Sequence, residues 1–160
     1  MERSTPIIPP VFAKKTRMTV SQHVIFTGEI MQLDKPQLEL KSAVEALIDA
    51  GCNYRLSDLE EIYSPELRIV ILQPDGSAIT FDYERNMNFF RQLRDSGSPP
   101  LDKTARFNHL EIIGDQGYVI VTRKMALGST PQTIVFNLML TKDSGHWQVY
   151  REHAVILGES

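Results

Sequence analysis

The chain has 160 residues, enough for one domain whose hydrophobic core needs no disulfide or metal to hold it. Hydrophobic residues make up 42% and charged residues 23%, and the net charge of −3 argues against a general nucleic-acid binder. The single cysteine, Cys52, excludes an internal disulfide and a thiolate zinc cluster. No apolar run approaches the roughly 20 residues that span a bilayer, and the amino terminus lacks the apolar core of a signal peptide. We therefore expect a cytoplasmic protein without a membrane partner.

The chain divides into a short arm and one domain. Residues 1–17 are rich in proline and basic side chains, which predicts a flexible basic arm, and residues 18–160 are expected to form a single domain. Residues 18–33 are apolar enough to pack but show no clear period. We find no repeat and no domain boundary after them.

Apolar residues recur at helical spacing in three places. The first helix is predicted over residues 37–51, after the start signals Asp34 and Pro36. A short second helix begins at Ser57 or Asp58 and ends before Pro65. The third helix covers residues 84–95.

The pattern then changes to that of strands joined by short turns. Such connections predict an antiparallel meander. Helices followed by long hairpins are typical of an α+β domain whose helices cover one face of a bent sheet, with a pocket left open at one end. The predicted strands are Leu67–Leu72, a short extended piece Ala78–Tyr83, and the runs Ala105–Ile113, Gly117–Leu127, Thr133–Thr141 and His146–Leu157.

Four local motifs in this order resemble the nuclear transport factor 2-like superfamily, which includes SnoaL-like cyclases and ketosteroid isomerases. They are the second helix and its exit (Asp58–Glu66), the following strand and turn (Val70–Gly76), a glycine-aspartate hairpin (Gly114–Val121) and the last strand (Trp147–His153). The resemblance implies a cystatin-like cone, in which three N-terminal helices pack on a strongly curved antiparallel sheet around a pocket. It also implies that no cofactor is needed and that copies pair as a homodimer through the outer sheet surface.

The ketosteroid isomerases within this superfamily allow a residue-by-residue comparison. Their general base precedes the proline of the first turn, where this chain has Gln73, and an amide is no base of useful pKa. Asn137 matches their oxyanion-stabilising aspartate and could donate a similar hydrogen bond. Their helix tyrosine has no clear match, although Tyr54 lies about one turn beyond. Isomerase activity of that type is therefore not expected.

The last strand carries the main chemical candidate, Glu152. The resemblance implies that Tyr150, Glu152 and Ala154 point into the pocket, whereas Trp147, Val149, Arg151 and His153 face the other way. Alternation alone does not choose the face. A desolvated Glu152 would have a raised pKa and could act as a general base. The alternative is a carboxylate paired with a basic residue on a neighbouring strand.

Each of the other candidate site residues can be interpreted either as part of the pocket or as a purely structural residue. His109 could reach the pocket mouth as an acid or base, and His153 could contact a ligand or lie at a subunit interface. Tyr118 and Thr122 share one face of their strand near Asn137, which makes either a polar pocket wall or an exposed sheet face. Phe90 on the third helix could line the pocket or fill the core. The four histidines show no metal-ligand spacing, so no metal is expected.

Three functions remain open. The leading hypothesis is a cofactor-free protein with a pocket for a hydrophobic small molecule. The first alternative is a cyclase, isomerase or dehydratase that uses acid and base residues inside the cone. The second is a module for protein–protein interaction or assembly.

Overall fold

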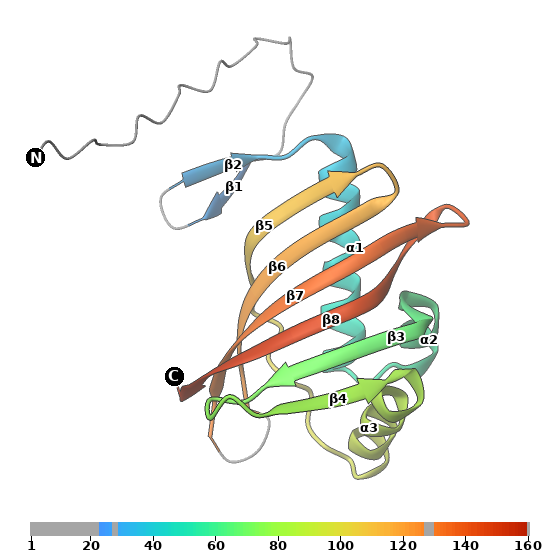
Figure 1. Cartoon of the computed structure of the whole chain (residues 1–160), viewed down its shortest axis with the longest axis vertical. Helices are drawn as coiled ribbons and strands as arrows, with labels where there is room; N and C mark the ends of the chain where they lie inside the picture. The colour runs from blue at the N-terminus through green and yellow to red at the C-terminus, as the bar shows by residue number, and fades with distance from the viewer. Residues whose placement is uncertain (1–22, 27–28, 127–129, 160) are drawn as a thin grey trace, which may run out of the picture.

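The computed structural model describes residues 23–26, 29–126 and 130–159. These residues form three α-helices, a six-stranded sheet and a separate two-stranded hairpin (Figure 1). This is the α+β architecture that the sequence predicted, with its helices on one face of a curved, open sheet. The sheet has the order β4-β3-β8-β7-β6-β5, where the strands are β3 (Tyr63–Leu72), β4 (Ala78–Asp82), β5 (Arg106–Ile113), β6 (Gln116–Met125), β7 (Gln132–Asp143) and β8 (His146–Glu159).

Helix α1 (Lys35–Cys52) begins at the predicted capping signal. The Asp34 carboxylate accepts a hydrogen bond from the backbone N–H of Gln37 at 2.9 Å, and the Gln37 side chain accepts one from the Asp34 N–H at 3.1 Å. This reciprocal pair satisfies two N–H groups that a helix start leaves without partners. Pro36 fits the first turn because its missing N–H is not needed there.

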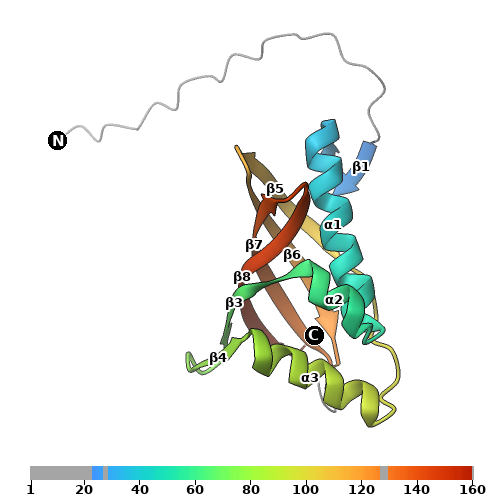
Figure 2. The same cartoon turned by 90° about the vertical axis from the view of Figure 1, so that its right-hand side faces the viewer.

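Two shorter helices complete the helical layer. Helix α2 (Leu56–Ile62) leads directly into β3, and helix α3 (Tyr83–Asp95) follows β4. The Asp82 carboxylate caps α3 by accepting from the Arg85 N–H at 2.9 Å. Helix α1 runs along the inner face of the sheet, and α3 lies across one end (Figure 2).

The sheet is mixed rather than purely antiparallel, which corrects the expectation. Strands β3 and β8 pair in parallel, and the other neighbours pair in antiparallel fashion. Hairpins reverse the chain between β3 and β4 and again at each step from β5 to β8. The connection through α3 joins β4 to β5 without such a reversal. As a result, β8 runs in the same direction as its neighbour β3. Strands β1 (His23–Phe26) and β2 (Glu29–Gln32) form the hairpin within the stretch that showed no period. The expected arm, residues 1–17, lies outside the described residues.

Close packing is concentrated at one end of the cone. Leu40 of α1 is fully buried, and a Cβ built on Gly117 of β6 would lie 2.7 Å from its Cδ1 atom. Glycine at this position therefore lets the helix approach the sheet closely. Val149 and Leu140 from β8 and β7 fill the same region. The sheet curves away from α1 toward α3, and the site lies at that end.

Candidate functional site

A cavity of about 1000 Å³ lies between the inner face of the sheet and helices α1 and α3. Its volume is at the upper end of the range for small-molecule sites, and its walls are mainly apolar, as in such sites. Polar groups reach it at only a few points. The apolar walls come from α1 (Val44, Leu47, Ile48), α3 (Phe89, Phe90, Leu93) and the sheet (Ile69, Val121, Ile134, Phe136, Leu138).

Glu152 of β8 presents its carboxyl group to this cavity. The Tyr63 hydroxyl on the neighbouring strand β3 donates a long hydrogen bond to Glu152 Oε2, at 3.5 Å. Burial raises the pKa of Glu152 to about 7, while the Tyr63 hydrogen bond and the positive charge of Arg123 lower it. Near neutral pH the carboxyl group is therefore poised between its neutral and ionised forms.

A bulge in β8 turns Glu152 toward the inside. Leu140 of β7 pairs with Val149, but the preceding residue, Met139, pairs with Arg151, so Tyr150 is an extra residue. The extra residue shifts the alternation, and both Val149 and Glu152 face inward. The expectation for the first half of this strand was therefore wrong: Trp147 and Val149 are buried in the core.

Tyr150 lies on the outer face of the sheet instead of in the cavity. Its hydroxyl donates to the exposed Gln116 side chain at 2.9 Å. The placement of the residues after the bulge agrees with the expectation. Ala154 lines the cavity, and Arg151 and His153 face outward.

One further polar side chain lies beside the Tyr63 hydroxyl. Asn86 of α3 is 4% exposed and lies beside Tyr63, but its Nδ2 makes no hydrogen bond of normal geometry to the described residues. Burial, followed by the charge of Glu152, raises the pKa of Tyr63 well above its ordinary value. The phenol therefore stays protonated and acts as a donor. Gln73, where the ketosteroid isomerases have their base, also lines the cavity.

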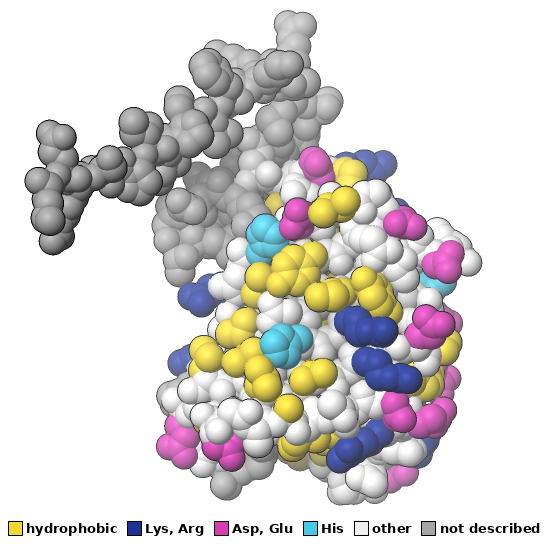
Figure 3. All heavy atoms as spheres, viewed as in Figure 1, with side chains coloured by type: hydrophobic (Ala, Val, Ile, Leu, Met, Phe, Trp, Pro, Cys, Tyr) yellow, Lys and Arg dark blue, Asp and Glu magenta, His cyan; other side chains and the backbone are white. Residues whose placement is uncertain are grey.

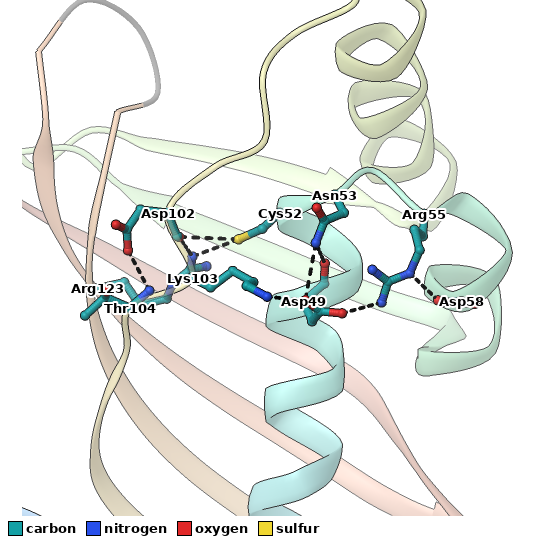
Figure 4. Close-up of polar contacts among 9 residues, drawn as sticks. All are labelled: Asp49, Cys52, Asn53, Arg55, Asp58, Asp102, Lys103, Thr104 and Arg123. Atoms are coloured by element: carbon teal, nitrogen blue, oxygen red, sulfur yellow. Dashed lines mark hydrogen bonds and ion pairs between the residues drawn. The ribbon is translucent and has the colours of Figure 1, made fainter.

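Arg123 of β6 provides a buried cation on the same inner face, and it is 8% exposed. Its Nη2 donates to the Cys52 sulfur at 3.0 Å and to the backbone oxygen of Asp102 at 2.5 Å (Figure 4). Its Nε atom is buried without a hydrogen-bond partner among the described residues. Arg123 was not among the residues predicted for the site from the sequence. The available signal was a basic residue that shares the alternation of the apolar residues Val121 and Met125.

Two of the residues predicted to bind a ligand lie on the cavity wall. Tyr54 is 6% exposed and donates from its hydroxyl to the Pro99 oxygen at 2.8 Å, which fastens the segment after α3 to the end of α1. Its positive φ of 54° turns the chain after α1. Phe90 of α3 packs over Gly51, where a Cβ would lie 3.5 Å from the ring.

The other predicted ligand-binding residues lie together on the outer face of the sheet. The Tyr118 hydroxyl donates to Asn137 Oδ1 at 3.0 Å, and Asn137 Nδ2 donates to the backbone oxygen of His153 at 3.3 Å. The Thr122 hydroxyl donates to Asn108 at 2.7 Å. These residues make separate polar contacts on the outer face, and the sheet lies between them and the cavity.

His109 also lies on the outer face, where it is exposed. Its Nε2 lies 3.3 Å from a Glu111 carboxylate oxygen, and its ring packs against that of Tyr118. The structure therefore does not bring His109 together with Glu152. Among the described residues, no group of three or more histidine, cysteine, aspartate or glutamate side chains is arranged to hold a metal ion.

None of the described helices is long and apolar enough to cross a membrane. No family model matches the chain, and no curated protein sequence matches it. Similarity to solved structures is clear. A nuclear transport factor 2-like protein of unknown function from Silicibacter pomeroyi aligns with a TM-score of 0.60 and 14% identity, over 74% of this chain and 93% of that chain.

Two other solved structures give the same result. A nuclear transport factor 2-like protein of unknown function from Shewanella baltica aligns with a TM-score of 0.62 and 12% identity, over 76% of this chain and 94% of its own. A candidate dehydratase of this type from Streptomyces avermitilis aligns with a TM-score of 0.58 and 14% identity, over 76% and 95%. The chain therefore has the nuclear transport factor 2-like fold that its sequence motifs resembled.

Proposed function

We propose that the protein binds an apolar small molecule in the cavity between the sheet and helices α1 and α3. The observation that supports this proposal is a cavity of about 1000 Å³ with apolar walls and few polar groups. Empty apolar space of this size sacrifices packing contacts that a filled core would make. A ligand that fills it would recover those contacts, and the few polar groups would orient it.

A pair of substitutions on β8 tests the proposal. Ala154 lines the cavity and Val155 is the next residue, on the opposite face. Ala154→Phe should fill part of the space and weaken binding of apolar probes such as 2-naphthol, measured by calorimetry or thermal shift. Val155→Phe adds similar bulk outside and should leave binding unchanged. Equal binding by both variants, or no binding of any apolar probe to the wild type, would contradict the proposal.

A second candidate function is acid–base catalysis without a cofactor. The observation in its favour is the cavity position of Glu152 together with a pKa of about 7, which suits a group that accepts and returns a proton at neutral pH. Tyr63 and Asn86 supply neighbouring donors for an oxygen of the substrate. The reaction class would be proton abstraction next to a carbonyl group, as in an isomerisation, cyclisation or dehydration.

The catalytic candidate is tested by Glu152→Gln with His109→Ala as its control. A general base contributes roughly 10²- to 10⁴-fold to a rate, so the glutamine variant should lose turnover of any carbonyl substrate by about that factor. The His109 variant should keep it, since His109 lies on the other face of the sheet. Unchanged turnover in Glu152→Gln would remove the acid–base role.

The outer sheet face supports pairing of two copies, the assembly that we propose alongside the pocket. Hydrophobic side chains gather over this face (Figure 3). Met139 is 40% exposed and Leu157 is 62% exposed, while Ile120, Val135 and Val155 are half-buried. Sedimentation of the wild type should give the mass of a dimer, and Met139→Lys should shift it toward the monomer. A wild-type monomer would favour a surface that binds a different protein.

A further inference from the structure

The guanidinium group of Arg123 carries a positive charge, and its hydrogen-bond acceptors within the protein are both uncharged. Its two hydrogen bonds both come from Nη2, and their acceptors are the Cys52 sulfur and a backbone oxygen. Arg123 forms no ion pair with the described residues. Desolvating a cation is costly unless it is paired, so this arrangement leaves electrostatic energy that a bound anion could recover.

The surroundings explain how the unliganded protein tolerates this charge. Arg123 lies at the C-terminal end of α1, where Cys52 and Asn53 end the helix and the free carbonyl groups give a partial negative charge (Figure 4). The Asp102 backbone oxygen adds a second dipole. These dipoles contact the cation directly, whereas the carboxyl groups of Glu152 and Asp102 interact with it only at a distance, without forming an ion pair.

The cavity offers access to this cation. Arg123 belongs to the cavity wall. Its Nε atom is sealed from solvent, whereas Nη1 makes no hydrogen bond to the described residues and is not among the sealed atoms. The accessible nitrogen of the guanidinium group is therefore Nη1. Its N–H groups have no hydrogen-bond acceptor among the described residues and are available to a ligand in the largely apolar cavity.

We infer that the ligand of this cavity is an apolar carboxylic acid, whose carboxylate binds the guanidinium group of Arg123 while its hydrocarbon part fills the space along α1 and α3. The inference rests on the proposed small-molecule pocket and adds the charge of the ligand. Charge-assisted hydrogen bonds from arginine to a carboxylate are about twice as strong as neutral ones, and the low dielectric of an apolar cavity strengthens them further.

A single negative charge fits the cavity better than a doubly charged phosphate. Arg123 is the one cationic side chain among the described residues of the wall, and Glu152 and Asp102 are the acidic ones. Asp102 is exposed to solvent, and Glu152, whose pKa is raised to about 7, is mostly neutral at about pH 6. A monocarboxylate then brings the one negative charge that Arg123 balances, whereas a dianion brings a second charge with no cation in the wall to pair with it.

The test compares acids with their uncharged amides on the wild-type protein. Decanoate against decanamide, and 2-naphthoate against 2-naphthamide, are titrated by calorimetry at about pH 6, where the acids are ionised and the paired probes have the same apolar body. We expect the acid of a pair to bind about tenfold more tightly or better, which corresponds to one charged hydrogen-bonded contact. Equal affinity of acid and amide would overturn the inference while leaving the pocket itself intact.

Two variants locate the preference. Arg123→Met should remove the preference for the acid over its amide. The affinity for the amides should stay within about threefold of the wild-type value, because the apolar walls are unchanged. Arg94→Met removes an exposed arginine of α3 and should preserve the preference. A preference that survives Arg123→Met would overturn the inference. If no probe of either kind binds the wild type, the small-molecule function fails together with it, and the wild-type comparison needs no variant to fold.

Discussion

The Tyr63 hydroxyl and the Glu152 carboxyl group meet inside the cone, 3.5 Å apart, from two strands that run in parallel. Tyr63 lies at the start of β3 and Glu152 just after the bulge of β8. Tyr63 shares the alternation of the buried residues Leu67 and Ile69, and the bulge of β8 turns Glu152 to the same face. The pair thus depends on the bulge of β8, and it places an ionisable group in a desolvated environment.

The first prediction concerns the pH dependence of stability. The pKa of Glu152 rises from 4.5 to about 7 on folding, so the folded protein binds more protons than the unfolded chain between these values. The favourable contribution is complete below about pH 4.5 and is lost as the pH rises through 7. We expect a loss of up to about 3 kcal/mol of unfolding free energy from this group, measured by urea denaturation between about pH 4.5 and 8.

Glu152→Gln is the control for this measurement. The amide cannot ionise, so its urea midpoint should not show this fall, and near pH 8 the variant should be more stable than the wild type. Parallel pH profiles for the two proteins would show that Glu152 titrates as it does in water.

The second prediction concerns Tyr63→Phe. The hydroxyl stabilises the ionised form of Glu152, because its hydrogen bond lowers the pKa of that carboxyl group. Its removal should raise the pKa of Glu152 further above 7, as measured by carboxyl ¹³C chemical shifts during a pH titration. Tyr150→Phe, on the outer face, should leave it unchanged. A lower pKa in Tyr63→Phe would mean that the hydroxyl does not donate to the carboxylate.

The sequence predicted the elements better than it predicted the faces. Helical spacing and the Asp34 capping signal located α1 to within a few residues, because both depend on local chemistry. The alternation of β8 did not reveal the bulge at Tyr150, which depends on pairing with a strand that is near in space. One extra residue exchanges the two faces, so Tyr150 lies outside and Val149 inside.

The candidate site was predicted in part for a similar reason. Glu152, Tyr54 and Phe90 lie on the cavity wall, whereas Asn137 and His109 lie on the other side of the sheet. The resemblance to ketosteroid isomerases suggested the Asn137 position by alignment. At 12–18% identity to solved structures of this fold, an alignment error of one residue reverses the face of a strand.

The third prediction concerns Gly117→Ala. The added methyl group would lie 2.7 Å from Leu40 Cδ1 and 3.2 Å from the Trp147 ring, so the fully buried Leu40 side chain and the Trp147 ring must shift within a closely packed region. We expect a loss of about 1–3 kcal/mol in unfolding free energy, measured by chemical denaturation. Gly51→Ala is the matched control, since its methyl group would make ordinary contact with Phe90 at 3.5 Å within a helix. It should be neutral or stabilising by up to about 1 kcal/mol.

The fourth prediction compares two tyrosine hydroxyls. Tyr54 is buried, and its hydroxyl donates a part-buried hydrogen bond to the backbone oxygen of the exposed residue Pro99. Tyr54→Phe should therefore cost about 1 kcal/mol of unfolding free energy, which is the net contribution of a typical intramolecular hydrogen bond. Tyr150→Phe removes an exposed hydrogen bond to Gln116, whose oxygen can bind water instead, and should cost less than about 0.5 kcal/mol.

Because Tyr54 and Pro99 both line the cavity, Tyr54→Phe should also speed amide hydrogen exchange at Leu101, whose N–H donates to the Cys52 oxygen at the end of α1. Equal stability losses in the two variants would show that the Tyr54 hydroxyl does not hold this segment against the helix.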